Sequence, residues 1–222
     1  MDEISGLVQV EFMKNKSEVP EMIVKGVKKM QSLYKLPVSK DAIFQSDGEA
    51  VYKGKKVNEV LTKLNLYQQF SPAYHPERNG TAERTYRTCF NDARAMLMSS
   101  PLPATYYPLA IEHAVLIRNL LPRENRKISA YESLTKQDPK NILERLHTFG
   151  AKAFVHNQKD DITKMQEKAF EGIYIGYDLR SDSHKVLNVK LIQAKLFVQQ
   201  KLELRTKLIL RRSSWIKDDM TV

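Results

Sequence analysis

The hydrophobic and polar positions in the first third of the chain change period several times. Leu7–Met13, with the sequence LVQVEFM, alternates and contains β-branched residues, so it predicts a strand. From about Glu18 the apolar residues follow helical spacing, and Pro20 suits the first turn of a helix. The same pattern predicts three further elements, in chain order: a strand over 41–47, a short amphipathic helix over 57–65 and a small strand over 67–72.

Two long helices follow in the pattern. Thr81–Ser99 is apolar on one side, whereas Thr105–Leu121 is apolar on almost every side and closes before Pro122, so we expect the second helix to be buried. The expected apolar stripe of the first helix is Ala82, Tyr86, Cys89, Phe90, Ala93 and Leu97. Its polar side is expected to carry Glu83, Arg84, Arg87, Asn91 and Arg94.

After Leu146 the period changes to two, and four further strands are predicted. Their sequences are AKAFVHN, GIYIGYD, HKVLNVK and AKLFVQQ. The front of the chain therefore reads as α/β and the back as all-β. The expected organisation is a core over 1–123, a linker with a short helix over 124–145, a small β unit over 146–200 and a basic tail of uncertain structure over 201–222.

Composition adds the nature of a partner. The 222 residues are 42% hydrophobic and 28% charged, which is enough for a core and argues against wholesale disorder. The formal net charge is +10, so we expect a polyanionic partner, with nucleic acid ahead of an acidic membrane. The alternative is a basic protein without a specific polyanionic ligand.

Cysteine and histidine usage limits the kinds of site that the chain could hold. Cys89 is the only cysteine, so no internal disulfide is possible and a reducing compartment fits. The five histidines are scattered without zinc-ligand spacing, and no structural zinc is expected. No apolar run approaches the length of a membrane span, so no membrane partner is expected.

Two carboxylates stand at places where chemistry is often found. Asp47 ends a predicted strand, and Glu83 lies in the first turn of a predicted helix. Ligands gather at strand ends in α/β sheets, and carboxylates there can share Mg²⁺ for phosphodiester chemistry. The alternative is structural, because Asp is common in turns and Glu complements the dipole of a helix start.

Specific words around these carboxylates resemble the integrase region of copia-type LTR retrotransposon Pol polyproteins. SPAYHPERNGTAERTYRT is similar to that family's Y-x-P-x-x-N-G-x-A-E-R-x-x-R-T, and ARAML and PLPATYYPLAIEHAVLIRN resemble its continuation. DEISGLVQVEFMKNKSEV, LHTFGAKAFVHN and KAFEGIYIGYD resemble segments before and after the core. The 35 residues between Asp47 and Glu83 match the last interval of the D,D-35-E triad, and the resemblance covers roughly residues 1–190.

The resemblance implies an RNase H-like integrase core of α/β class, followed by a small SH3-like all-β unit. It implies that Asp47 and Glu83 are catalytic ligands of Mg²⁺ or Mn²⁺ and that Gly80 is the hinge of a mobile active-site loop. It also implies a set of DNA-binding residues: Arg84, Arg87, Arg94, Asn79 and His75. These side chains would track phosphates and make binding sensitive to salt.

The match departs from the family at its first catalytic aspartate. In the family that residue lies upstream of the segment that Asp2 matches, so the resemblance implies a truncated core. One alternative is that Asp2 takes its place, although Asp2 matches a non-catalytic position. A second departure is SDGEAVY, where Gly48 directly follows Asp47 and the family has an asparagine before the glycine.

Three functions stay open on the sequence. The first is a remnant of an integrase that joins the 3′ ends of element DNA to target DNA by metal-dependent transesterification, and this chain alone is expected to be inactive. The second is a non-enzymatic fragment that binds nucleic acid or oligomerises. The third is a relic reading frame without a stable fold. The resemblance implies a nuclear location, with the cytoplasm also open, and a homo-oligomer in the intact family.

Overall fold

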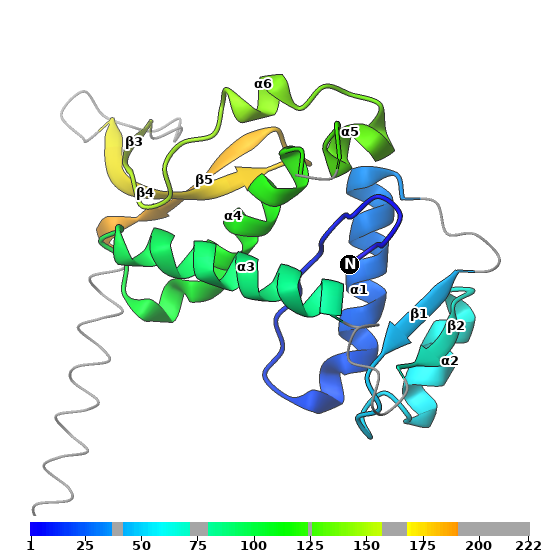
Figure 1. The fold of residues 1–222 in the computed structure, drawn as a ribbon. Helices are drawn as coiled ribbons and strands as arrows, with labels where there is room; N and C mark the ends of the chain where they lie inside the picture. Colours follow the sequence, from blue (N-terminus) through cyan, green and yellow to red (C-terminus); the bar gives the residue numbers. More distant parts are fainter. Residues whose placement is uncertain (37–41, 72–79, 124–125, 157–167, 191–222) are drawn as a thin grey trace, which may run out of the picture. The chain divides into compact units, whose positions relative to one another are not determined.

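The structure is a computed structural model, and it describes residues 1–36, 42–71, 80–123, 126–156 and 168–190. The chain divides into two units, which are described separately. The first unit comprises residues 1–150 and 175–184, and the second comprises 151–174 and 185–222. Figure 1 labels the helices and strands along the chain.

Helix α1 (Val19–Tyr34) organises the first unit. A short 3-10 turn, Lys16–Glu18, leads into it, and Pro20 occupies its first turn as predicted. Its C-terminal half contributes Met30 and Tyr34 to the main hydrophobic core. The other buried members of that core come from the N-terminal segment, α4, α5 and β4: Leu7, Leu116, Leu120, Ala130, Tyr131 and Tyr177.

Helices α3 (Gly80–Met98) and α4 (Tyr107–Leu120) pack together and form the most extensive contact between elements (Figure 1). The prediction that the second of them is buried is confirmed, because more than half of the residues of α4 are inaccessible to solvent. One of these is His113, which is 3% exposed and lies beside the ring of Phe149 with 5.9 Å between ring centroids. Burial lowers the pKa of His113 to about 4.

A small βαβ unit follows α1 in the chain. Strand β1 (Ile43–Ser46) pairs in parallel with β2 (Tyr67–Phe70), and α2 (Lys55–Lys63) connects them. A second core cluster holds this unit to the start of α1. It consists of buried Val19, Val57 and Leu61, with Ile23, Phe44, Val51, Tyr52 and Leu66 packed around them. Both predicted strands and the helix between them are confirmed.

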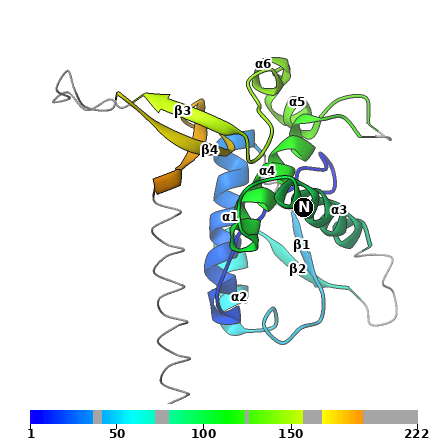
Figure 2. The same ribbon diagram turned by 90° about the vertical axis from the view of Figure 1, so that its left-hand side faces the viewer.

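The predicted strand over Leu7–Met13 is wrong. This segment runs extended along α1, where Glu11 forms ion pairs with Lys25 at 2.8 Å and Lys29 at 3.7 Å, and no described strand pairs with it (Figure 2). Burial along the segment does not alternate, because Leu7 and Val8 are both buried, and a strand also needs a neighbouring backbone.

A side chain takes the place of that neighbouring backbone at one residue. The Asn119 amide accepts a hydrogen bond from the Val8 N–H at 2.9 Å and donates one to the Val8 carbonyl at 2.8 Å. The same amide nitrogen lies 3.4 Å from the Tyr34 hydroxyl. Asn119 is 0% exposed, so these bonds satisfy a buried backbone position that would otherwise lack partners.

Arginines after α4 hold the first residues of the chain. The Arg123 guanidinium donates to the Gly6 carbonyl, and Arg126 donates to the carbonyls of Glu3 and Ile4. Gly6 has a φ of 73°, and the guanidinium of Arg123 lies against it. The turn at the start of the chain is therefore held by hydrogen bonds from its carbonyl groups to arginine side chains more than a hundred residues away.

The segment expected to be a linker with a short helix contains two short helices. Helix α5 (Ala130–Thr135) is capped by Ser129, whose hydroxyl accepts from the Glu132 N–H at 3.0 Å, and α6 (Lys140–Leu143) follows. Ala130 and Tyr131 belong to the main core, so this segment is packed into the first unit.

A cluster of polar side chains lies at the turn after β4. The Tyr177 hydroxyl and the Arg145 guanidinium both donate to the Asp182 carboxylate, and these two hydrogen bonds lower the pKa of Asp182. His184 lies beside this cluster, and its ring centroid is 5.1 Å from that of His147 and 5.4 Å from that of Tyr177.

The remaining strands form one sheet in the order β3, β4, β5. Strand β3 (Lys152–His156) pairs antiparallel with β4 (Ala169–Asp178), and β5 (Ser183–Asn188) lies on the other side of β4. Gly172 of β4 is required by packing, because a Cβ there would lie 2.3 Å from the Val186 side chain. The predicted strand over 194–200 and the tail over 201–222 lie outside the described residues.

The α/β class predicted from the periodicity is confirmed by this mixture of helices and strands. Three of the four strands predicted after Leu146 are present among the described residues. The SH3-like character of the small β unit and the domain boundaries stay predictions.

The Asn119 contact yields a stability prediction. Replacing Asn119 by Ala leaves the Val8 N–H and carbonyl buried without partners, so the free energy of unfolding should fall by about 2–3 kcal/mol. Urea denaturation followed by circular dichroism measures this loss. Asn58→Ala, at an exposed position of α2, is the matched control and should change stability by less than about 0.5 kcal/mol. Equal stability of the two variants would contradict this role for Asn119.

The burial of His113 yields a pH prediction. An unfolded histidine binds a proton near pH 6.5, whereas folded His113 stays neutral down to about pH 4, so stability should fall as the pH falls through this window. Replacing His113 by Leu should remove up to about 3 kcal/mol of that loss, measured by denaturation at pH 7 and pH 4.5. The control is His156→Leu, at an exposed histidine of β3, which should keep the wild-type dependence. Parallel pH profiles for His113→Leu and the wild type would contradict the assignment.

Candidate nucleic-acid interface on helix α3

The side of α3 that faces the protein is defined by small residues. Thr85, Cys89 and Ala93 are buried and recur every fourth position. Thr85 also approaches α4, since its hydroxyl lies 3.4 Å from the Arg118 guanidinium. Burial is the main cause that raises the pKa of the Cys89 thiol, so this residue stays protonated near neutral pH.

The predicted apolar stripe of this helix is therefore partly wrong. Cys89 and Ala93 are buried as expected, but Tyr86 and Phe90 are exposed by 64% and 43%. Size explains the difference, because small side chains let α3 approach α4 closely and bulky rings at those positions would hold it away. The rings lie on the side of α3 that faces solvent.

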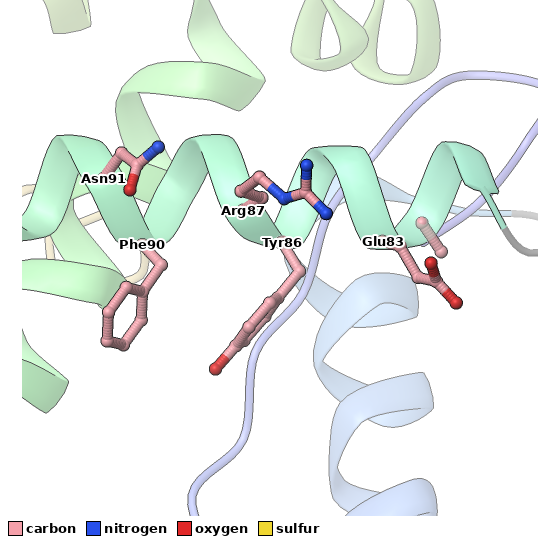
Figure 3. A pocket seen from close by; sticks show the side chains of 6 residues that line it. Glu83, Tyr86, Arg87, Phe90 and Asn91 are labelled. Atoms are coloured by element: carbon pink, nitrogen blue, oxygen red, sulfur yellow. The ribbon is translucent and has the colours of Figure 1, made fainter.

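A shallow hollow follows this exposed side of α3. Figure 3 shows its lining side chains, which are Ala82, Glu83, Tyr86, Arg87, Phe90 and Asn91. Tyr86 and Phe90 point to the same side of the helix, with ring centroids 5.9 Å apart and ring planes at 31°. The hollow thus combines two aromatic faces with one carboxylate, one guanidinium and one amide.

The predicted DNA-binding arginines all lie on α3 and are exposed. These are Arg84, Arg87 and Arg94. The Arg84 guanidinium donates to the Thr81 hydroxyl at 3.3 Å, which directs it toward the start of the helix. Exposed guanidinium groups on a rigid helix are suited to phosphate oxygens, because they offer several donors in a fixed plane.

Asp47 directly follows β1, where the sequence predicted it, and it is exposed. Its carboxylate accepts a hydrogen bond from the Glu49 N–H at 3.3 Å, which is a local turn contact. Lys16 lies nearby and forms an ion pair with Glu49 at 2.8 Å. In the described part of the chain no hydrogen bond or ion pair joins Asp47 to Glu83, so its observed contacts are those of a turn.

The residues present do not fit a complete metal centre. Within the described ranges, no three His, Cys, Asp or Glu side chains lie close enough together to hold a metal ion. Asp2, considered as a substitute third ligand, instead accepts hydrogen bonds from the backbone N–H and the hydroxyl of Ser5. Asp47 and Glu83 therefore stay predicted ligands of Mg²⁺ or Mn²⁺, without a third side chain to complete the set.

Two predicted DNA-binding residues, His75 and Asn79, lie outside the described residues. Gly80 is the first residue of α3. Gly80 does not have a left-handed backbone conformation. A Cβ added to it would meet only the end of the Arg84 side chain, at 3.1 Å. The hinge role of Gly80 stays a prediction.

The apolar pattern alone does not predict that Tyr86 and Phe90 are exposed, because they are apolar and lie at helical spacing in the expected stripe. The spacing of Thr85, Cys89 and Ala93 is the signal that could have corrected this, because it offers a second stripe made of small residues.

Among the described helices there is no candidate for a membrane span, since each of them is too short or too polar.

Comparison with known proteins gives relatives among transposon polyproteins. The chain is 26% identical over 165 residues, or 73% of its length, to a retrovirus-related Pol polyprotein from transposon TNT 1-94 of Nicotiana tabacum. It is 26% identical over 134 residues, or 60% of its length, to the corresponding protein from transposon RE2 of Arabidopsis thaliana. The matches cover only 12% and 9% of those relatives. The expected relationship to transposon Pol polyproteins is confirmed.

No protein-family model matches the chain. Among solved structures, the HTLV-2 integrase catalytic core domain, in complex with magnesium in a trimeric form, is similar with a TM-score of 0.45 and 20% identity. That match covers 60% of this chain and 79% of the integrase domain. At this TM-score the likeness does not by itself establish a shared fold.

The position of Gly80 yields a prediction about the start of α3. Since neither its backbone nor its surroundings require glycine, replacing Gly80 by Ala should leave stability unchanged or raise it by up to about 1 kcal/mol. Thermal unfolding followed by circular dichroism measures this. A loss of more than about 1 kcal/mol would show that the helix start needs glycine. The control is Gly172→Ala, which should be destabilising because its Cβ would overlap Val186.

Proposed function

We propose that this chain is an integrase region of a retrotransposon Pol polyprotein and that it binds DNA through the exposed side of α3. The similarity to Pol polyproteins of plant transposons supports the origin. Their whole activity cannot be transferred to a chain that matches about a tenth of their length, so binding is the function proposed. The net charge of +10 supports a polyanionic ligand.

The observation that carries the proposal is the row of exposed arginines on one rigid helix. Arg84, Arg87 and Arg94 are separated by at most ten residues, which is roughly 15 Å along a helix axis. That length spans several phosphates of a DNA strand. The helix is held by its contact with α4, so the backbone that carries the arginines is ordered before DNA arrives and little backbone entropy is lost on binding.

Catalysis is the part of the family's activity that the chain does not support by itself. This chain resembles a family of integrases, and the resemblance implies that an intact member has an RNase H-like core and holds divalent metal with three carboxylates. Asp47 and Glu83 would supply two of them, and in the described residues no third side chain lies with them. We therefore propose that this chain binds DNA without joining strands.

The proposed compartment is the nucleus, because an integrase region acts on target DNA there. Assembly as a homo-oligomer is also proposed, because the sequence resembles a family whose intact members are expected to oligomerise.

The salt dependence of DNA binding tests the arginine row. Fluorescence anisotropy with a labelled duplex, repeated over a range of salt concentrations, gives the slope of log affinity against log salt. The double variant Arg84→Gln/Arg87→Gln should reduce the magnitude of this slope by about two, because each phosphate contact contributes about 0.9. Lys28→Gln/Lys63→Gln is the matched control, since it removes the same charge from exposed positions on α1 and α2.

Equal slopes for the two double variants would contradict the assignment to α3. A strand-joining assay with Mn²⁺ tests the catalytic part of the proposal, and the chain should give no product. Product formed by the wild type and abolished in Glu83→Gln would overturn the proposal that the chain binds DNA without catalysis.

A further inference from the structure

Two large aromatic side chains are exposed together on a helix whose solvent side also carries charged residues of both signs. Tyr86 and Phe90 keep 64% and 43% of their surface exposed, and their ring centroids are 5.9 Å apart. This spacing is within the contact range of aromatic pairs, so the two rings form one continuous apolar surface. Neighbouring exposed aromatic rings are typical of interaction surfaces.

The groups around the rings have the chemistry of a nucleotide site. Figure 3 shows Tyr86 and Phe90 extending from the same side of α3, with Glu83 nearer the start of the helix. Arg87 and Asn91 complete the lining of the hollow. A guanidinium binds phosphate, an amide can donate to and accept from the edge of a base, and an aromatic face stacks on a base.

We propose that this hollow binds unpaired nucleobases, which stack on Tyr86 and Phe90 while Arg87 contacts the adjoining phosphate. The inference deepens the proposed DNA binding and rests on it. The rings touch each other, so a base stacks on their outer faces and not between them. The ligand is a single strand or an opened DNA end, because bases inside a duplex are already stacked on one another.

Charge favours nucleic acid over a second copy of the chain. The same helix carries three exposed arginines against two exposed carboxylates, Glu83 and Asp92, and the whole chain carries a net charge of +10. A second copy would bring the same positive charge to the interface, whereas a DNA strand brings phosphates that neutralise it. Self-association through the rings is thus the less favourable occupant and becomes an outcome of the test.

A comparison of normal and abasic strands tests the proposal. Fluorescence anisotropy is measured with labelled oligothymidine, with an abasic strand of equal length and charge, and with a duplex. The wild-type protein should bind oligothymidine at least about tenfold more tightly than the abasic strand, because stacking one base on an aromatic ring raises the affinity by roughly this factor. Tyr86→Leu/Phe90→Leu should abolish this preference, since leucine keeps the helix and removes only the aromatic faces.

The matched control is Tyr67→Leu/Phe154→Leu, which removes two exposed aromatic rings elsewhere and should keep the preference. Circular dichroism establishes that both double variants are folded. Equal binding of normal and abasic strands by the wild-type protein would overturn this inference, and so would a preference that survives in Tyr86→Leu/Phe90→Leu. In either case, binding of the duplex by the wild-type protein would leave the proposed function intact. Absence of all DNA binding overturns both. Sedimentation of the DNA-free protein that shows a dimer lost in Tyr86→Leu/Phe90→Leu would assign the rings to self-association and overturn the inference.

Discussion

The close contact between α3 and α4 is the interaction on which the first unit depends. Thr85, Cys89 and Ala93 are small enough for the two helices to approach each other. Since successive helical residues are turned by about 100°, burying these positions determines which others face solvent. Glu83, Tyr86 and Arg87 are then presented together on a rigid support. The chemistry of the candidate interface is a geometric consequence of small side chains on the opposite side.

The second helix of this contact also holds the start of the chain. Asn119 lies on α4 and replaces a neighbouring strand for one residue of the N-terminal segment, while Arg123 and Arg126 hold the turn before it. These contacts join residues more than a hundred positions apart, so they order the N-terminal segment at an entropic cost of loop closure. The buried Asn119 amide and the two guanidinium groups offset that cost by giving main-chain groups of the N-terminal segment hydrogen-bond partners.

Much of the fold could be predicted from the sequence because helical periodicity is local. The boundaries of α1, α3 and α4 follow from spacing, prolines and the apolar character of each segment. The strand at Leu7–Met13 failed because pairing depends on a distant partner that local alternation does not report. The predicted apolar stripe of α3 is wrong at Tyr86 and Phe90, because hydrophobicity alone ignores the size of the side chains. Asp47 and Glu83 came from motif resemblance. The structure places Asp47 directly after β1 and Glu83 in the first turn of α3, and in the part of the chain that it describes no three His, Cys, Asp or Glu side chains gather into a metal site.

The lone thiol in the contact between α3 and α4 has an experimental consequence. Cys89 is the only cysteine in the chain, it is shielded from solvent, and burial keeps it in the unreactive protonated form. Its alkylation by a reagent in solution therefore requires the helix pair to separate transiently. Labelling kinetics at this position would report the opening rate of that contact, and they would separate local breathing of the helix pair from global unfolding without any engineered label.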